Sequence, residues 1–221
     1  RRPRRTRLDC SFNWVRERVR GYSIMPPVTT QPVSGECGAH VAVEAFESRA
    51  RILNAKENQP FPTLSILHLT DQLRDAMAAA TTTAARQRVR HEETPFELLT
   101  HTGVVTKEDY DAAPAGQGFT RNVQVLYQQG NGDPVKDTLN EIASHGPVYG
   151  WFILNVTSFS AARHGIYRAP QAKHKSDTHA VLLYGFGARG RRTSAMCYQN
   201  NWGRHYHVNG RGLIETNSIV A

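Results

Sequence analysis

The chain has 221 residues, of which 39% are hydrophobic and 9% are aromatic. This composition fits one domain or two small lobes with a substantial core, and it excludes an intrinsically disordered chain. Lys and Arg number 27 against 19 Asp and Glu, for a net charge of +8. No apolar run reaches the roughly 20 residues of a membrane span, so we expect no membrane partner.

The N-terminal residues 1–8 are predicted to be a basic tail, because five of the first seven residues are Arg. Such a run is typical of a solvated tail rather than of a folded element. The chain has neither a groove of alternating basic and aromatic residues nor a finger motif, which argues against nucleic acid as a partner. Residues 9–33 are predicted to be extended and irregular, because Pro26, Pro27 and Pro32 interrupt them.

Helical patterns dominate residues 34–122. The first helix is predicted from Cys37 to about Ile52, and a second over residues 64–80. The Ala- and Thr-rich residues 78–90 favour either an extension of that second helix or an exposed insertion. A further helix is predicted to start at Thr94, with Pro95 at the first helical position, and to end at Gly103.

Strand patterns dominate residues 123–221. The predicted strands cover residues 123–127, 148–156, 180–186, 194–199 and 212–215, all rich in Val, Ile, Leu, Phe and Tyr. One short helix between them is predicted to begin at Pro134, with Asp133 as its cap. The sequence therefore predicts an α+β fold in one domain, residues 9–221, with a helical lobe followed by a β-rich lobe.

One thiol, one imidazole and two amides form the candidate catalytic set. Cys37 lies where a loop enters a helix rich in small residues, and His179 begins an apolar run. Asn200 precedes Asn201-Trp202-Gly203, and Gln31 lies six positions before Cys37. A thiol activated by an imidazole, which an amide orients in turn, is the arrangement that a cysteine nucleophile requires.

The cysteine count favours a reducing compartment. Cys10, Cys37 and Cys197 are the three cysteines, so at most one disulfide can form. A chain that begins with Arg leaves a removed leader open, so a secretory or vacuolar location stays the alternative to an intracellular one. His205 and His207 lack a third ligand nearby, and we therefore expect no metal and no cofactor.

Short motifs in a fixed order carry a resemblance to a known family. They are Gln31–Ser48, Leu64-Ser65, Gly103–Tyr110, Gly146-Pro147-Val148, Gly165-Ile166-Tyr167, His179-Ala180-Val181 and Asn200-Asn201-Trp202-Gly203. On these residues the chain resembles the papain family of cysteine proteases over roughly residues 8–215. The stretch around Cys37 aligns with the family's nucleophile segment without a gap.

The resemblance implies a papain-like fold, with a helical left lobe, an antiparallel β-barrel-like right lobe and an active-site cleft between them. It implies that Cys37 is the nucleophile, His179 the base and acid, and Asn200 the residue that orients His179. Gln31 would donate to the oxyanion, and Trp202 would shield the His179–Asn200 hydrogen bond. The substrate would be a polypeptide.

Several residues depart from the family's pattern. Glu92 and Glu93 stand where the family has two glycines that bind substrate backbone, and Thr178 replaces the usual Asp or Asn before the histidine. Ser34 and Gln72 occupy positions of family disulfide cysteines.

These departures leave two main interpretations. One is a working cysteine endopeptidase with altered specificity. The other is a catalytically degenerate papain-like protein that serves as a binding or assembly subunit of a larger complex. A precursor fragment that lacks its pro-region is a third interpretation.

Overall fold

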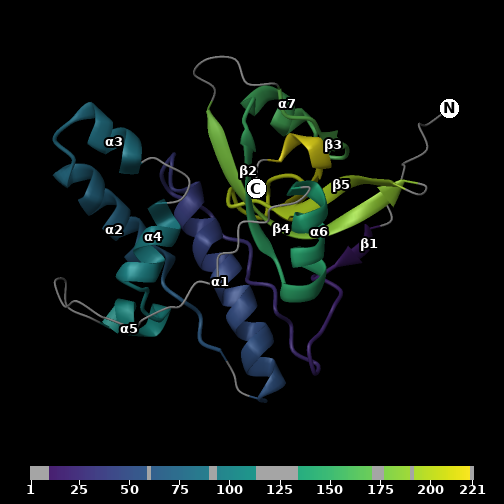
Figure 1. Ribbon diagram of the computed structural model, residues 1–221, viewed down its shortest axis with the longest axis horizontal. Coiled ribbons are helices and arrows are strands. Elements are labelled where there is room, and N and C mark those ends of the chain that lie inside the picture. The colour runs from purple at the N-terminus through teal and green to yellow at the C-terminus, as the bar shows by residue number, and fades with distance from the viewer. Residues whose placement is uncertain are drawn as a thin grey trace.

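The structure of the chain, a computed structural model, describes residues 10–58, 61–89, 94–112, 134–170, 177–189 and 192–219. The predicted basic tail and the predicted strand 123–127 lie outside the described residues. Helices α1 to α5 lie on one side of the molecule and a sheet lies on the other, accompanied by α6 and α7 (Figure 1). The predicted α+β class is confirmed.

The helices in the described ranges are α1 (Cys37–Lys56), α2 (Ile66–Ala79), α3 (Thr83–Val89), α4 (Thr94–His101), α5 (Lys107–Ala112), α6 (Pro134–His145) and α7 (Val156–Ala161). Of these, α1, α2, α4 and α6 correspond to predicted helices, whereas α5 and α7 were not predicted. None of the helices in these described ranges combines the length and the apolar character needed to cross a membrane.

Local signals account for several helix ends. The Ser65 side chain caps α2 by accepting a hydrogen bond from the backbone N–H of His68 at 3.2 Å. Gly103 follows α4 with φ of +77°, and its N–H donates to the carbonyl of Leu98, which ends that helix as predicted. Ala80 is extended, so residues 83–89 form a separate, mostly exposed helix rather than a continuation of α2.

The strands form one open sheet. They are β1 (Cys10–Asn13), β2 (Val148–Ile153), β3 (Ile166–Tyr167), β4 (Thr178–Arg189), β5 (Arg192–Gln199) and β6 (Arg211–Glu215), with a 3-10 turn over Thr216–Ser218. The order is β1-β4-β5-β6-β3, and β2 pairs with β4. All pairs are antiparallel except β3 with β6, so the sheet resembles a barrel wall that does not close.

Strand β4 is the centre of this sheet. It pairs with β1, β2 and β5, and residues 180–183 are fully buried, which explains their unbroken apolar run. At Gly185 the backbone of β1 comes very close, because a Cβ there would lie 2.5 Å from the carbonyl oxygen of Phe12. Only glycine allows β1 to pair at this point.

One prediction about an element was wrong. The strand predicted over residues 148–156 ends at Ile153, because the Asn155 side chain accepts from the N–H of Ser158 at 3.0 Å and caps α7. Within the segment 9–33, predicted to be extended and irregular, residues 10–13 form β1, which pairs with the distant β4.

The apolar core falls into two clusters. The larger lies under the sheet and contains Phe152, Phe159, Tyr167, Leu182, Leu183 and Tyr198, while the smaller lies among α1, α2 and α4 around Leu69 and Leu99. Tyr149 on β2 packs against both clusters. The helical part and the sheet are therefore joined by side-chain packing beside the start of α1.

A buried carboxyl group also connects the two parts. Glu44 on α1 accepts a hydrogen bond from the Thr29 hydroxyl at 2.8 Å and another from Gln199 Nε2 at 3.4 Å. The side-chain oxygen Oε1 of Gln199 accepts in turn from the Arg211 guanidinium at 2.9 Å, and His40 Nδ1 lies 3.0 Å from the Thr29 hydroxyl. This Glu44 junction holds α1, the N-terminal segment and strands β5 and β6 together.

Burial governs the charge of this junction. It raises the pKa of Glu44 to about 8, against the opposing effect of the hydrogen bonds from Thr29 and Gln199. Burial likewise lowers the pKa of His40 to about 4. At neutral pH the carboxyl group is therefore largely protonated and the His40 imidazole is neutral, so neither of these two buried groups carries a charge in the core.

We predict that Phe159→Ala lowers the free energy of unfolding by about 3–5 kcal/mol, because it empties a fully buried site in the larger cluster. Urea unfolding measures this loss. The control is Val156→Ala on the same helix, whose side chain is 55% exposed and whose truncation should change stability by less than about 0.5 kcal/mol. A loss of under about 1 kcal/mol for Phe159→Ala would contradict the packing described.

We predict that the protein loses about 2 kcal/mol of stability as the pH rises from 6.5 to 9, because folded Glu44 keeps its proton up to a pKa of about 8. The unfolded chain has released that proton by about pH 4.5, so stability present at low pH is lost as the pH passes the folded pKa. Urea unfolding at a series of pH values tests this. Glu44→Gln should flatten the dependence, and equal slopes for the two proteins would refute the prediction.

Candidate active site

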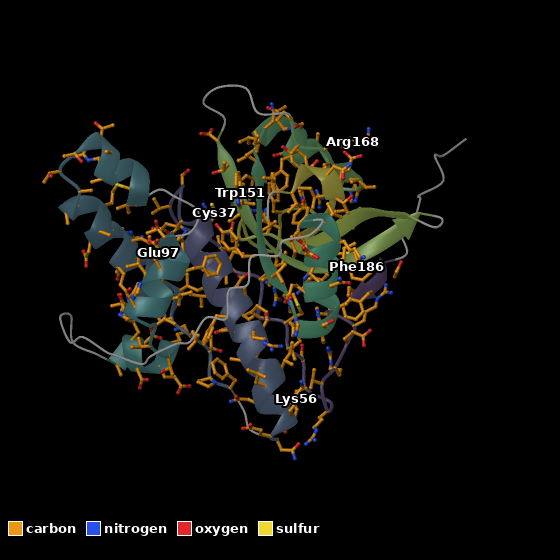
Figure 2. All side chains as sticks on the ribbon, viewed as in Figure 1. Cys37, Lys56, Glu97, Trp151, Arg168 and Phe186 are labelled. Atoms are coloured by element: carbon orange, nitrogen blue, oxygen red, sulfur yellow. The ribbon has the colours of Figure 1, made fainter. Side chains whose placement is uncertain are left out.

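Cys37 is the first residue of α1, at the end of the helix that faces the sheet. Figure 2 shows Cys37 at this end and Lys56 at the other, so the helix N-terminus points toward β2. The thiol is partly buried against the larger core cluster. A cysteine in the first turn of a 20-residue helix lies at the positive end of the helix dipole, which stabilises a thiolate.

His179 and Asn200 are hydrogen-bonded to each other in the core of the sheet. Nε2 of His179 lies 2.8 Å from Oδ1 of Asn200, and both side chains are buried. Oδ1 also accepts from the backbone N–H of Asn201 at 2.9 Å, which fixes its orientation. An oxygen acceptor at this place requires the proton on Nε2 of the neutral ring, so Nδ1 of His179 carries the lone pair.

Aromatic rings surround His179. The Trp202 ring lies 4.6 Å from the imidazole between centroids, and Phe152 and Phe159 each lie 5.7 Å from it in edge contact. The imidazole is only 2% exposed. The Trp202 indole therefore packs directly on the imidazole that Asn200 binds.

This apolar surrounding decides the charge of the imidazole. Burial lowers the pKa of His179 to about 4, the Asn200 hydrogen bond opposes that shift, and His207 adds to it. At neutral pH His179 is accordingly a neutral base. Because the folded pKa lies below the unfolded value of 6.5, this residue opposes folding as the pH falls from 6.5 toward 4.

Asn201 connects Cys37 to the His179–Asn200 pair, and sequence analysis did not identify it as a site residue. Its Nδ2 donates to the carbonyl oxygen of Cys37 at 3.2 Å, while its backbone N–H donates to Asn200. Cys37 and His179, 142 positions apart, are thus joined through two adjacent asparagines. The two adjacent asparagines in Asn200-Asn201-Trp202-Gly203 were the only hint in the sequence. Asn201 has the same side chain as any other asparagine, so its role could not be recognised before its partners were known.

Gln31 is held next to this asparagine pair. Its backbone N–H donates to the carbonyl of Asn201 at 2.7 Å, and the N–H of Gly203 donates to the carbonyl of Thr29 at 2.9 Å. The Gln31 side-chain Nε2 donates to the carbonyl of Val33 at 3.1 Å. Its Oε1 is buried and accepts no hydrogen bond from any described residue. The segment that carries Gln31 is therefore bound to the Asn201–Gly203 loop.

The candidate substrate-binding residues divide into two groups. Thr178 is exposed at the start of β4, directly before His179, and Trp202 packs on the imidazole. Glu92 and Glu93 lie outside the described residues.

The residue after the nucleophile is closely packed. A Cβ on Gly38 would lie 3.2 Å from Cγ of Pro95 and 3.4 Å from the Tyr149 hydroxyl. Phe96 packs edge-on against Tyr149 with ring centroids 4.8 Å apart. Gly38 thus makes room for α4 and β2 to meet beside Cys37, and a larger residue at this position would push them apart.

Of the cysteine side chains that the structure describes, Cys37 and Cys197, neither forms a disulfide. Within the same described residues, no cluster of three or more His, Cys, Asp or Glu side chains is arranged to hold a metal ion. The site therefore consists of a thiol, an imidazole and amides.

Several solved structures are similar to this chain in fold. The digestive procathepsin L2 proteinase from the larval midgut of Tenebrio molitor matches with a TM-score of 0.65 and 21% identity, over 96% of this chain and 64% of that one. Procathepsin L 3 from the same source matches with a TM-score of 0.60 and 16% identity, over 88% of this chain and 63% of that one. These likenesses support the predicted papain-like fold.

Two curated proteins match a shorter stretch. Cathepsin R of Mus musculus is 31% identical and cathepsin J of Rattus norvegicus 33% identical, each over 72 residues. Each match covers 31% of this chain and 22% of the relative, so only a minor part of each relative is matched.

The family model described as "Papain family cysteine protease" matches residues 9–219, which is nearly the whole chain. It covers the loop before Cys37, the sheet with His179, and the Asn200–Gly203 loop. With the α+β fold and the hydrogen-bonded site, this match is decisive: the chain belongs to the papain family of cysteine proteases.

Proposed function

We propose that the protein is a cysteine endopeptidase that cleaves polypeptides through a thioester on Cys37. One observation carries the proposal: the hydrogen bonds that run from His179 through Asn200 and Asn201 to the carbonyl of Cys37. Three segments far apart in the sequence contribute to this chain of contacts. These contacts support the proposal because they connect the thiol-bearing helix end to the imidazole through buried amides.

The proposed reaction begins with the neutral imidazole. Nδ1 of His179 removes the proton of the Cys37 thiol as the sulfur attacks the peptide carbonyl carbon. The resulting imidazolium then gives that proton to the departing amine, and a thioester remains on Cys37. Water, deprotonated by the same nitrogen, attacks the thioester, releases the acid and restores the thiol.

Asn200 and Trp202 would serve this cycle by controlling His179. The Asn200 oxygen holds the proton on Nε2, so that the basic nitrogen is Nδ1 throughout. Trp202 lies close enough to keep water from competing for that bond. Since burial lowers the pKa of His179 to about 4, the imidazolium formed during attack is a strong acid and returns its proton readily.

The developing oxyanion needs donors near Cys37. We propose that the backbone N–H of Cys37 and the second N–H of the Gln31 side-chain amide supply them, since the Gln31 segment is bound to the Asn201–Gly203 loop. Glu92 and Glu93 are proposed to restrict the substrate because, by resemblance, they replace glycines that bind its backbone. Thr178 is proposed to contact the substrate before His179.

We predict that iodoacetamide labels Cys37 selectively and at least about tenfold faster than an ordinary thiol at pH 6, because the helix N-terminus stabilises the thiolate and neutral His179 accepts the thiol proton as the sulfur attacks. Mass spectrometry of the labelled peptides measures the rate for each cysteine. His179→Ala should remove the advantage.

The fully buried Cys197 is the internal control. If Cys37 reacts no faster than Cys10 and Cys197, and no internally quenched peptide from a diverse library is cleaved, the peptidase proposal fails. The alternative, a papain-like binding or assembly subunit, would then account for the protein.

We predict that Asn200→Asp moves the acidic limb of the activity profile to higher pH, because a carboxylate beside His179 raises the imidazole pKa and removes the base at low pH. The measurement is kcat/KM against pH for the peptide that is cleaved best. A shift to lower pH would contradict the neutral-base mechanism, because it is the response expected of a thiolate–imidazolium pair.

A further inference from the structure

A buried carboxyl group directly precedes the proposed nucleophile. Glu36 is the N-cap residue of α1 and is only 8% exposed. Its side chain does not cap the helix. One of its oxygens is bonded to the Arg74 guanidinium on α2, and the other is buried and meets no hydrogen-bond donor among the described residues. The residue before Cys37 is therefore a buried carboxyl group with a hydrogen-bond donor on only one of its two oxygens.

Arg74 connects this acid to two helices. Besides Glu36, its guanidinium binds Asp71 one turn earlier on α2 at 2.8 Å, and Asp71 accepts a hydrogen bond from the Tyr110 hydroxyl on α5. Glu36 raises the pKa of Arg74 through their hydrogen bond. The loop before Cys37 is thereby anchored to the helical part of the molecule by one cation.

Charge decides what this anchor does to the thiol. The charged or titratable groups identified near the Cys37 end of α1 are Glu36 in the loop, His40 on α1, Asp71 and Arg74 on α2, Tyr149 on β2, and His179 on β4. Burial keeps both imidazoles neutral at neutral pH, so Arg74 is the cation among them that can offset Glu36. A carboxylate left without that cation would oppose formation of the thiolate on the next residue.

We propose that Arg74 is a positioning residue for Cys37, which keeps the thiol reactive by holding and neutralising Glu36. The proposal rests on the proposed role of Cys37 as nucleophile. Arg74 touches neither the substrate nor the reacting atoms in this scheme, and it acts through Glu36. Arg74 therefore lowers the pKa of the Cys37 thiol, so that more of it is thiolate at a given pH.

The test is the rate of Cys37 alkylation by iodoacetamide against pH, in the full chain and its variants. Arg74→Ala is expected to raise the apparent pKa of Cys37 by about 0.5–1 unit and to slow alkylation at pH 6 about three- to tenfold. Arg74→Lys should restore most of the rate, because it returns the charge. The double variant Arg74→Ala with Glu36→Gln should return the profile to that of the wild type.

Two controls separate charge from folding. Lys107→Ala removes the same charge from an exposed ion pair with Asp111 on α5 and should leave the profile unchanged. A thermal melt of each variant reports folding, and Arg74→Gln replaces Arg74→Ala if the latter is unstable. A purely structural role for Arg74 would lower the melting temperature without moving the pKa of Cys37.

The outcomes distinguish this proposal from the peptidase proposal. If Cys37 is unusually reactive in the wild type but Arg74→Ala and Arg74→Gln leave its pKa unchanged, the Arg74 proposal is overturned and the peptidase proposal stands. If wild-type Cys37 titrates as an ordinary thiol and no peptide is cleaved, yet Arg74→Ala still raises the pKa of Cys37, the charge coupling stands and the peptidase proposal fails. A double variant that stays as slow as Arg74→Ala would exclude Glu36 as the cause.

Discussion

The buried carboxyl group of Glu44 is the contact on which the site's geometry depends. It binds Thr29, two residues before Gln31, and Gln199, one residue before Asn200. It lies on the same helix as Cys37, two turns further along. The segments that carry Gln31, Cys37 and Asn200 are thus fixed at this one point in the core, and His179 is held in turn by its hydrogen bond to Asn200. A protonated carboxyl suits such a place, because it accepts and donates hydrogen bonds without burying a charge.

Burial among apolar rings controls the charge of His179, whereas nearby charges and the helix dipole act on Cys37. His179 lies among Phe152, Phe159 and Trp202, and this apolar surrounding keeps the imidazole neutral. Cys37 lies at a helix terminus near the Glu36–Arg74 pair, where charges and the helix dipole act on the thiol. The asparagine pair between them transmits position rather than charge. Neutral bonds of this kind hold the geometry over a wide pH range.

Much of the helical part could be predicted, because its signals are local. Ser65 and Gly103 mark helix ends through contacts within a few residues, and α4 begins at Thr94 as predicted. The sheet was less predictable. β1 and β3 are too short to have a pattern of their own and exist because β4 and β6 pair with them. The apolar run from Val148 predicted too long a strand, because the cap at Asn155 competes with strand continuation.

The sequence by itself determined the fold class, the order of the helices and the four candidate catalytic positions, since these follow from residue type, spacing and motif order. Only the tertiary structure decided the roles of Asn201, Glu44 and Arg74. Their chemistry is ordinary until burial and distant partners act on it: Glu44 keeps its proton because the core excludes water. Arg74 matters because Glu36, 38 positions away, has been folded against it. Such effects depend on what surrounds a side chain, which no local pattern contains.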